Sequence, residues 1–166
     1  MKIVMTILAV IIMSACVVAF AMENFEAPKS CKICRMDRTM FARTRMLLIY
    51  SDGVTAGFCS IHCTAEEMMN HRNKQVKAVL VADYFTKELI DAKSAVWVVG
   101  GKNRGVMTAL PKWAFAKGEN ALRFIKENGG IVNSFDQVIN SATKEVMDQA
   151  AEEKDVENEI LHERQQ

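Results

Sequence analysis

Apolar residues are arranged in three ways along this chain of 166 residues, and each arrangement predicts a different part of the molecule. An almost uninterrupted apolar run covers residues 3–22. Between residues 31 and 147, short apolar stretches of strand length alternate with segments in which apolar residues recur every three or four positions. Glutamate and aspartate dominate from residue 148 onward. We therefore expect an export segment, a folded domain and a tail.

The N-terminal segment, residues 1–21, has the features of an export signal, because Lys2 precedes the long apolar run. Two processing sites compete within it. The residues ending at Cys16 resemble the lipobox of bacterial lipoproteins, whereas residues 19–21, Ala-Phe-Ala, fit ordinary signal peptidase. An uncleaved membrane anchor of about 20 residues is a third alternative. All three place the remainder in the periplasm or on the outer face of a bacterial membrane.

The first half of the domain, residues 31–84, has the pattern of two strands, a helix and a third strand. Residues 46–50 and 54–58 are β-prone and flank a Ser-Asp-Gly turn, which predicts a hairpin. A third strand is expected at residues 76–81. Between them, Ser60 or a capping box at residues 64–67 starts a helix. Its apolar face consists of Ile61, Ala65, Met68 and Met69.

The second half, residues 85–147, repeats this order. Strands are expected at residues 95–99 and 106–109, followed by a helix over residues 113–128 that breaks near its Gly118 and ends at a Gly-Gly pair. A last helix begins near Phe135, with its apolar stripe formed by Phe135, Val138, Ile139, Ala142 and Val146. The prediction is an α+β fold of two related strand-strand-helix-strand lobes plus a C-terminal helix.

Polar composition identifies two segments that flank the domain, and the overall charge argues against nucleic acid as a partner. Residues 22–30 read as a linker, and residues 148–166 as an acidic tail that is either a solvated helix or disordered. The 21 lysines and arginines are balanced by 20 aspartates and glutamates. The broad basic surface of a nucleic-acid-binding protein is therefore not expected.

Four cysteines of the domain form two pairs, Cys31 with Cys34 and Cys59 with Cys63. A CxxC turn directs both sulfurs into one pocket, and a pair around a helix start directs two more toward a common point. This pattern suits a soft metal ion. Two other soft ligands, Met36 and His62, lie within the same motifs; His62 is equally well interpreted as a surface or capping residue.

Three kinds of chemistry remain open for these cysteines. Four thiolates alone form a closed structural zinc site, whereas the thioether of Met36 favours copper(I), Cu(I), because zinc seldom binds methionine. Two disulfides are a second alternative in an oxidising compartment. A thiol-disulfide oxidoreductase using Cys31 and Cys34 is the third, although such a motif normally opens a helix after a strand. No hydrolase motif or phosphate loop is recognisable, and Asp83 and Asp91 flank predicted elements as caps, so we expect a protein that is not an enzyme.

Several motifs together resemble the NosL family. The resemblance covers residues 31–135 and rests on the segments 31–36, 58–63, 83–84, 90–92, 95–100, 105–108, 114–115 and 129–130. Members of this family are copper(I)-binding, usually lipid-anchored accessory proteins of nitrous oxide reductase maturation, with a fold of two related lobes. The resemblance implies Cys34 and Met36 as copper(I) ligands, with Cys31 close by, whereas the family usually has glycine where this chain has Arg35.

The cysteine spacing by itself also resembles the TRASH metal-handling domains, which implies a four-thiolate site for zinc or another heavy metal. The two resemblances differ in the number of ligands. We expect an extracytoplasmic copper(I) metallochaperone that transfers its ion to an apo-cuproenzyme such as nitrous oxide reductase. Its metal ligands are expected among Cys31, Cys34, Met36, Cys59, His62 and Cys63, and its membrane attachment at a lipid on Cys16 or at an N-terminal anchor.

Overall fold

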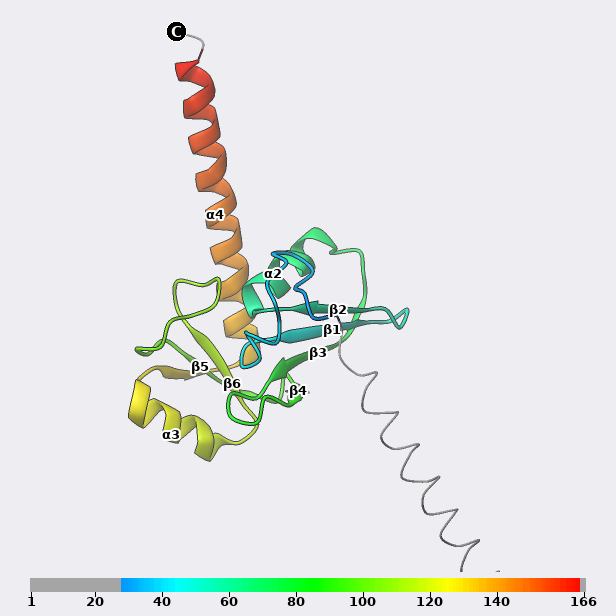
Figure 1. The fold of residues 1–166 in the computed structure, drawn as a ribbon, viewed down its shortest axis with the longest axis vertical. Helices are drawn as coiled ribbons and strands as arrows, with labels where there is room; N and C mark the ends of the chain where they lie inside the picture. The colour runs from blue at the N-terminus through cyan, green and yellow to red at the C-terminus, as the bar shows by residue number, and fades with distance from the viewer. Residues whose placement is uncertain (1–27, 165–166) are drawn as a thin grey trace, which may run out of the picture.

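Two small antiparallel sheets form the framework of the protein in the computed structural model, which describes residues 28–164 (Figure 1). Their strand orders are β2-β1-β3-β4 and β6-β5-β7. The strands are Met46–Tyr50 (β1), Thr55–Phe58 (β2), Val76–Ala82 (β3), Leu89–Asp91 (β4), Val96–Val99 (β5), Lys112–Phe115 (β6) and Ile131–Asn133 (β7). The export segment, Cys16 and most of the 22–30 linker lie outside the described residues.

Both sheets are built in the same order along the chain. In each, the first strand lies in the middle and pairs antiparallel with the next two, and a helix connects those two. These helices are Ile61–Asn70 (α2) and Gly118–Asn128 (α3), and the C-terminal helix is Phe135–Glu163 (α4). The predicted α+β fold of two strand-strand-helix-strand lobes with a C-terminal helix is therefore confirmed.

Two local predictions for the second lobe are wrong. Residues 106–109 form bends instead of a strand, and Met107 has a left-handed backbone with φ 58°. Residues 113–115, expected to begin a helix, instead belong to the strand β6, and all four residues of that strand are buried against β5. The helix begins only at Gly118 and ends where Gly129 takes φ 79°, as the Gly-Gly pair predicts.

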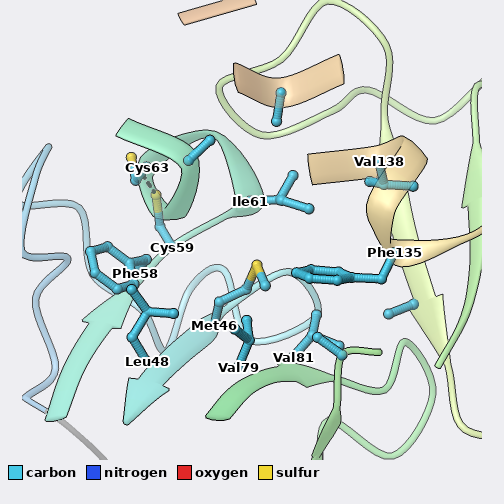
Figure 2. Packing of buried hydrophobic residues seen from close by; sticks show 14 of the residues in the cluster. Met46, Leu48, Phe58, Cys59, Ile61, Cys63, Val79, Val81, Phe135 and Val138 are labelled. Atoms are coloured by element: carbon cyan, nitrogen blue, oxygen red, sulfur yellow. Dashed lines mark hydrogen bonds between the residues drawn. The ribbon is translucent and has the colours of Figure 1, made fainter. Parts of the chain in front are cut away.

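The larger core cluster lies between the four-stranded sheet, α2 and the start of α4. Figure 2 shows Met46 from β1 beside Phe135 from α4, with Ile61 and Val138 on the helices above them. A smaller cluster under α3 contains Val98, Trp113, Phe115 and Phe124. Because α4 packs on both α2 and β5, the two lobes share one interface.

Asp83 joins the lobes at the end of β3. One carboxylate oxygen accepts the N–H groups of Phe85 and Thr86, and the other accepts that of Ala116, at 3.0, 2.8 and 2.7 Å. Burial opposes ionisation of this side chain, but these hydrogen bonds outweigh it and hold the pKa of Asp83 below its ordinary value. The expected capping role of Asp83 is thus observed, as is that of Asp91, which accepts the Ser94 N–H at 2.9 Å.

The C-terminal helix α4 extends far beyond the domain (Figure 1). Its start is fixed by a capping box between Ser134 and Gln137, and its buried residues are Phe135, Val138 and Ala142. From residue 147 onward all the described residues of this helix are exposed, so the acidic segment is a solvated helix. Within residues 28–164, no helix combines the length and apolar character needed to cross a membrane.

Candidate metal centre

The first cysteine pair lies in a tight turn that is attached to the end of the hairpin. The Cys31 N–H donates to the Met36 carbonyl at 2.8 Å, and the Arg35 N–H donates to the Cys31 carbonyl at 3.1 Å. To close this turn, Arg35 adopts a left-handed backbone with φ 65°. The Lys32 N–H donates to the Gly57 carbonyl at 2.9 Å, which places the turn against β2.

The second pair spans the junction between β2 and α2. Cys59 follows the last residue of β2, and Cys63 lies in the first turn of α2, whose N-cap position is Ser60. The Thr44 hydroxyl donates to the Cys59 carbonyl at 2.8 Å and fixes this junction. Cys59 thus lies just before the helix and Cys63 within it, and their Sγ atoms lie 3.7 Å apart (Figure 2).

The two pairs converge on a common point. The Sγ atoms of Cys31, Cys34, Cys59 and Cys63 all lie within 4.8 Å of one another, and those of Cys34 and Cys59 are 3.4 Å apart. All four are free thiols. Three of them are fully buried, whereas Cys34 is partly exposed. The arrangement is therefore a cluster of four thiols, one of which is partly exposed to solvent.

The clustered thiols shift one another's pKa values. Hydrogen bonds from the thiols of Cys59 and Cys63 hold the pKa of Cys31 far below its ordinary value, against the effect of burial. The contact with Cys31 in turn raises the pKa of Cys59 to about 12 and that of Cys63 further. One thiolate stabilised by its thiol neighbours can accept a soft cation, and the cation then displaces the remaining protons.

The buried side chain of Arg38 holds the segment after the first cysteine pair in place. The Arg38 guanidinium, 2% exposed, donates to the carbonyls of Pro28, Met46 and Phe58 at 3.0, 3.1 and 3.2 Å. It thereby ties the segment after the CxxC turn to both strands of the hairpin. Nothing in the sequence distinguishes Arg38 from the surface arginines, so this role was not predicted.

A buried carboxylate connects the two cysteine pairs through their neighbours. Glu67 lies on α2, one turn after Cys63, and forms an ion pair with Lys32, the residue after Cys31. It also accepts the Tyr50 hydroxyl at 2.7 Å. Burial disfavours its charge, but the hydrogen bonds from Lys32 and Tyr50 prevail and lower the pKa of Glu67. The CxxC turn is therefore fastened to the helix that carries Cys63.

The other two predicted ligands, Met36 and His62, have different surroundings: Met36 packs with the cysteine-containing cluster, and His62 lies among charged groups. Met36 closes the turn through its backbone, and its partly buried side chain packs on the core cluster that contains the cysteines. His62 is 4% exposed and is not among the four grouped side chains. Burial lowers its pKa, and the charges that act on it are those of Glu66 on α2, Glu145 on α4 and Lys112 on β6.

Comparison of the sequence with known protein families identifies the family of this chain. A sequence model of the NosL family matches residues 22–143, which include both cysteine pairs and both lobes. The chain belongs to the NosL family. The resemblance on which the sequence interpretation relied is thereby confirmed.

A solved structure agrees with this NosL fold. The crystal structure of the copper chaperone NosL from Shewanella denitrificans matches with a TM-score of 0.51 and 21% identity, over 68% of this chain and 91% of that chain. At this identity the similarity supports the fold. No match was found among curated proteins.

Proposed function

We propose that this NosL protein binds copper(I) at its cysteine cluster and delivers the ion to a copper enzyme outside the cytoplasm. The convergence of four Sγ atoms within 4.8 Å is the observation that carries the proposal. Thiolates are the preferred ligands of copper(I), and the similar crystal structure is that of a copper chaperone. The ion is the cargo of this protein, and its transfer needs no catalytic turnover.

Delivery by ligand exchange requires one ligand that a client can reach. Cys34 meets this requirement, because it is partly exposed while Cys31, Cys59 and Cys63 are fully buried. Its sulfur lies 3.4 Å from that of Cys59, so an ion captured at Cys34 also reaches the buried thiols. We assign the four cysteines as the ligand set, with Met36 supplying a thioether that favours copper(I) over zinc.

Competition titration tests this assignment. Reduced protein is titrated with copper(I), and separately with zinc, against a chelator of known affinity. Met36→Leu preserves side-chain volume and removes only the thioether, so it should weaken copper(I) binding and leave zinc binding unchanged. Both affinities should fall on acidification, because thiolate ligands must lose their protons. An X-ray absorption spectrum of the copper(I) form without a sulfur shell would contradict the proposal.

A structural zinc site is the second candidate, and the four clustered thiols favour it specifically. Cys₄ sites with tetrahedral geometry are typical of closed zinc centres. The two functions differ in exchange behaviour. A structural zinc ion should raise the melting temperature strongly and resist transfer, whereas copper(I) bound for delivery should pass to an apo-protein acceptor within minutes.

The extracytoplasmic location of this proposal rests on the export segment, residues 1–21. Cys16→Ala separates its three alternatives. A lipoprotein loses its modification site, and with it the mass of the lipid, in this variant, whereas a chain cleaved after residue 21 has the same mature mass in both forms, and an uncleaved anchor retains the whole segment. Nitrous oxide reductase is the client that we propose from the family, and copper loading of that apo-enzyme by this protein is the direct test.

A further inference from the structure

A second cleft, separate from the cysteines, lies between the segment at residues 39–44 and the second lobe. Its volume is about 230 Å³. Its walls include the apolar side chains of Met40, Phe41 and Val106, together with Arg43, Lys87 and the indole of Trp113. None of the residues that line it is acidic. The cleft therefore combines apolar walls with positive charge.

Its two cations are available to a ligand. The guanidinium of Arg43 lies over the ring of Tyr84, with its Cζ 5.2 Å from the ring centre. Lys87 has a left-handed backbone with φ 63°, held by its N–H donating to the Asp83 carbonyl at 2.8 Å. Among the described residues, neither cation forms an ion pair with a carboxylate.

The indole of Trp113 forms part of the cleft wall. Trp113 is 7% exposed, and its Nε1–H is buried without a hydrogen-bond acceptor among the described residues. The second tryptophan differs, because the Nε1–H of Trp97 donates to the Ala92 carbonyl at 2.8 Å. Because this N–H is shielded from solvent, we use the Trp113 indole as a reporter of the cleft and not as a donor to its ligand.

We propose that this cleft binds a carboxylate attached to an apolar body. A carboxylate matches the fork of N–H groups on Arg43 and neutralises Lys87. Met40, Phe41 and Val106 cover the hydrocarbon part. The source is either a small free acid or an acidic side chain of a partner protein beside an apolar residue.

The cleft adjoins the metal centre at Thr44. Thr44 lines it and also donates its hydroxyl to the Cys59 carbonyl at 2.8 Å. An acidic residue of a docked protein would therefore lie next to the junction that carries Cys59. The carboxylate site itself requires no metal and goes beyond the proposed copper function.

The two tryptophans allow a direct measurement on the full-length protein. With ¹⁵N-labelled tryptophan, NMR gives one indole signal for each of the two residues. Titration with phenylacetate should shift the Trp113 signal saturably and leave the Trp97 signal in place. Equal binding of the uncharged phenylacetamide, or a larger response to inorganic phosphate, would overturn the proposal.

A blocked dipeptide, acetyl-Phe-Asp-amide, distinguishes the two sources. Tighter binding of the peptide than of phenylacetate identifies an acidic side chain, and the reverse order identifies a free acid; both results support the site. No saturable shift of the Trp113 signal with either compound would overturn it.

Paired variants test the cations. Arg43→Gln combined with Lys87→Gln should weaken phenylacetate binding about tenfold, since two charged partners are lost. Arg72→Gln combined with Lys77→Gln is the matched control, because these residues are exposed and do not line the cleft. Unchanged affinity in the first pair, with the fold confirmed by circular dichroism, would show that the cleft does not recognise the charge.

Discussion

The Sγ of Cys34 lies 3.4 Å from the Sγ of Cys59, a residue 25 positions later in the chain. This contact connects the exposed cysteine of the CxxC turn to the buried pair at the start of α2. A metal ion bound at Cys34 therefore has further sulfur ligands within reach, beyond those of its own turn. The number of cysteines that hold the ion becomes a measurable quantity.

Removal of the second cysteine pair should weaken metal binding as severely as removal of the first. Cys59→Ser together with Cys63→Ser is expected to lower the copper(I) affinity more than tenfold, about 1.4 kcal/mol or more of binding free energy. The comparison is with Cys31→Ser together with Cys34→Ser, measured by chelator competition. Ser51→Ala is the control, because Ser51 is exposed in the turn of the β1-β2 hairpin. If the second pair proves dispensable, the site consists of Cys34 and Met36 alone.

Some parts of the fold follow from local pattern and others do not. The hairpin β1-β2 and the helix α2 were predicted because apolar spacing and turn residues act over a few positions. The strand β6 was missed because its residue Lys112 is buried by an ion pair with Glu145, 33 positions later, at 2.6 Å. The short strands β4 and β7 have three residues each, too few to show a period.

In the candidate site, too, the features set by local sequence were predicted and those set by long-range contacts were not. Cysteine spacing predicted that the two pairs point toward a common region, and the four sulfurs do converge. The residues that hold the two cysteine pairs in place, Arg38 and Glu67, were not predictable from the sequence. Arg38 is fixed by backbone carbonyls, which carry no residue-specific signal, and Glu67 meets Lys32 only after the chain has folded.

The ion pair between Lys32 and Glu67 should contribute to both stability and metal affinity. Glu67→Gln retains the acceptor for Tyr50 but removes the charge that faces Lys32. Because the Lys32 side chain is 41% exposed, solvent screens the pair, and we expect a loss of about 1 kcal/mol in unfolding free energy. Copper(I) affinity should fall several-fold as the CxxC turn loosens. Asp148→Asn, which breaks the exposed pair with Lys144, should change neither quantity.

The ionisation of Glu67 also determines how the unfolding free energy should depend on pH. The pKa of Glu67 is below its ordinary value of 4.5 in the folded state. Its contribution to stability is therefore present above about pH 4.5 and is lost as the pH falls through the folded pKa. Asp83 acts in the same direction. Denaturant unfolding between pH 3 and 6 should show a shallower acid decline for Glu67→Gln than for the wild type; parallel curves would contradict this assignment.

Arg35 is expected to be a strained residue that glycine would relieve. It holds φ 65° in the turn between Cys34 and Met36, a conformation that side chains with a Cβ rarely adopt. Arg35→Gly should therefore stabilise the protein by about 1 kcal/mol, seen as a higher melting temperature. Arg72→Gly is the control, because Arg72 lies in a turn without positive φ and gains only backbone freedom. A lower melting temperature for Arg35→Gly would show that the arginine side chain contributes more than the strain costs.

The last prediction concerns His62, which lies beside Cys63 in the sequence but is buried toward the Lys112–Glu145 ion pair. Its Nδ1 has no hydrogen-bond partner among the described residues. His62→Leu removes this unsatisfied group at similar volume, so unfolding free energy should stay unchanged or rise by up to about 1 kcal/mol. Copper(I) affinity should not change, in contrast to Met36→Leu.

The pH dependence of His62→Leu provides a second readout. Burial lowers the pKa of His62 below its ordinary value of 6.5, so wild-type stability is present above about pH 6.5 and declines as the pH falls through the folded pKa. His62→Leu should remove this part of the decline, whereas His162→Leu, on the exposed end of α4, should retain it. A loss of copper(I) affinity of tenfold or more in His62→Leu would instead make His62 a ligand, and the site would then have to include the side of α2 that faces α4.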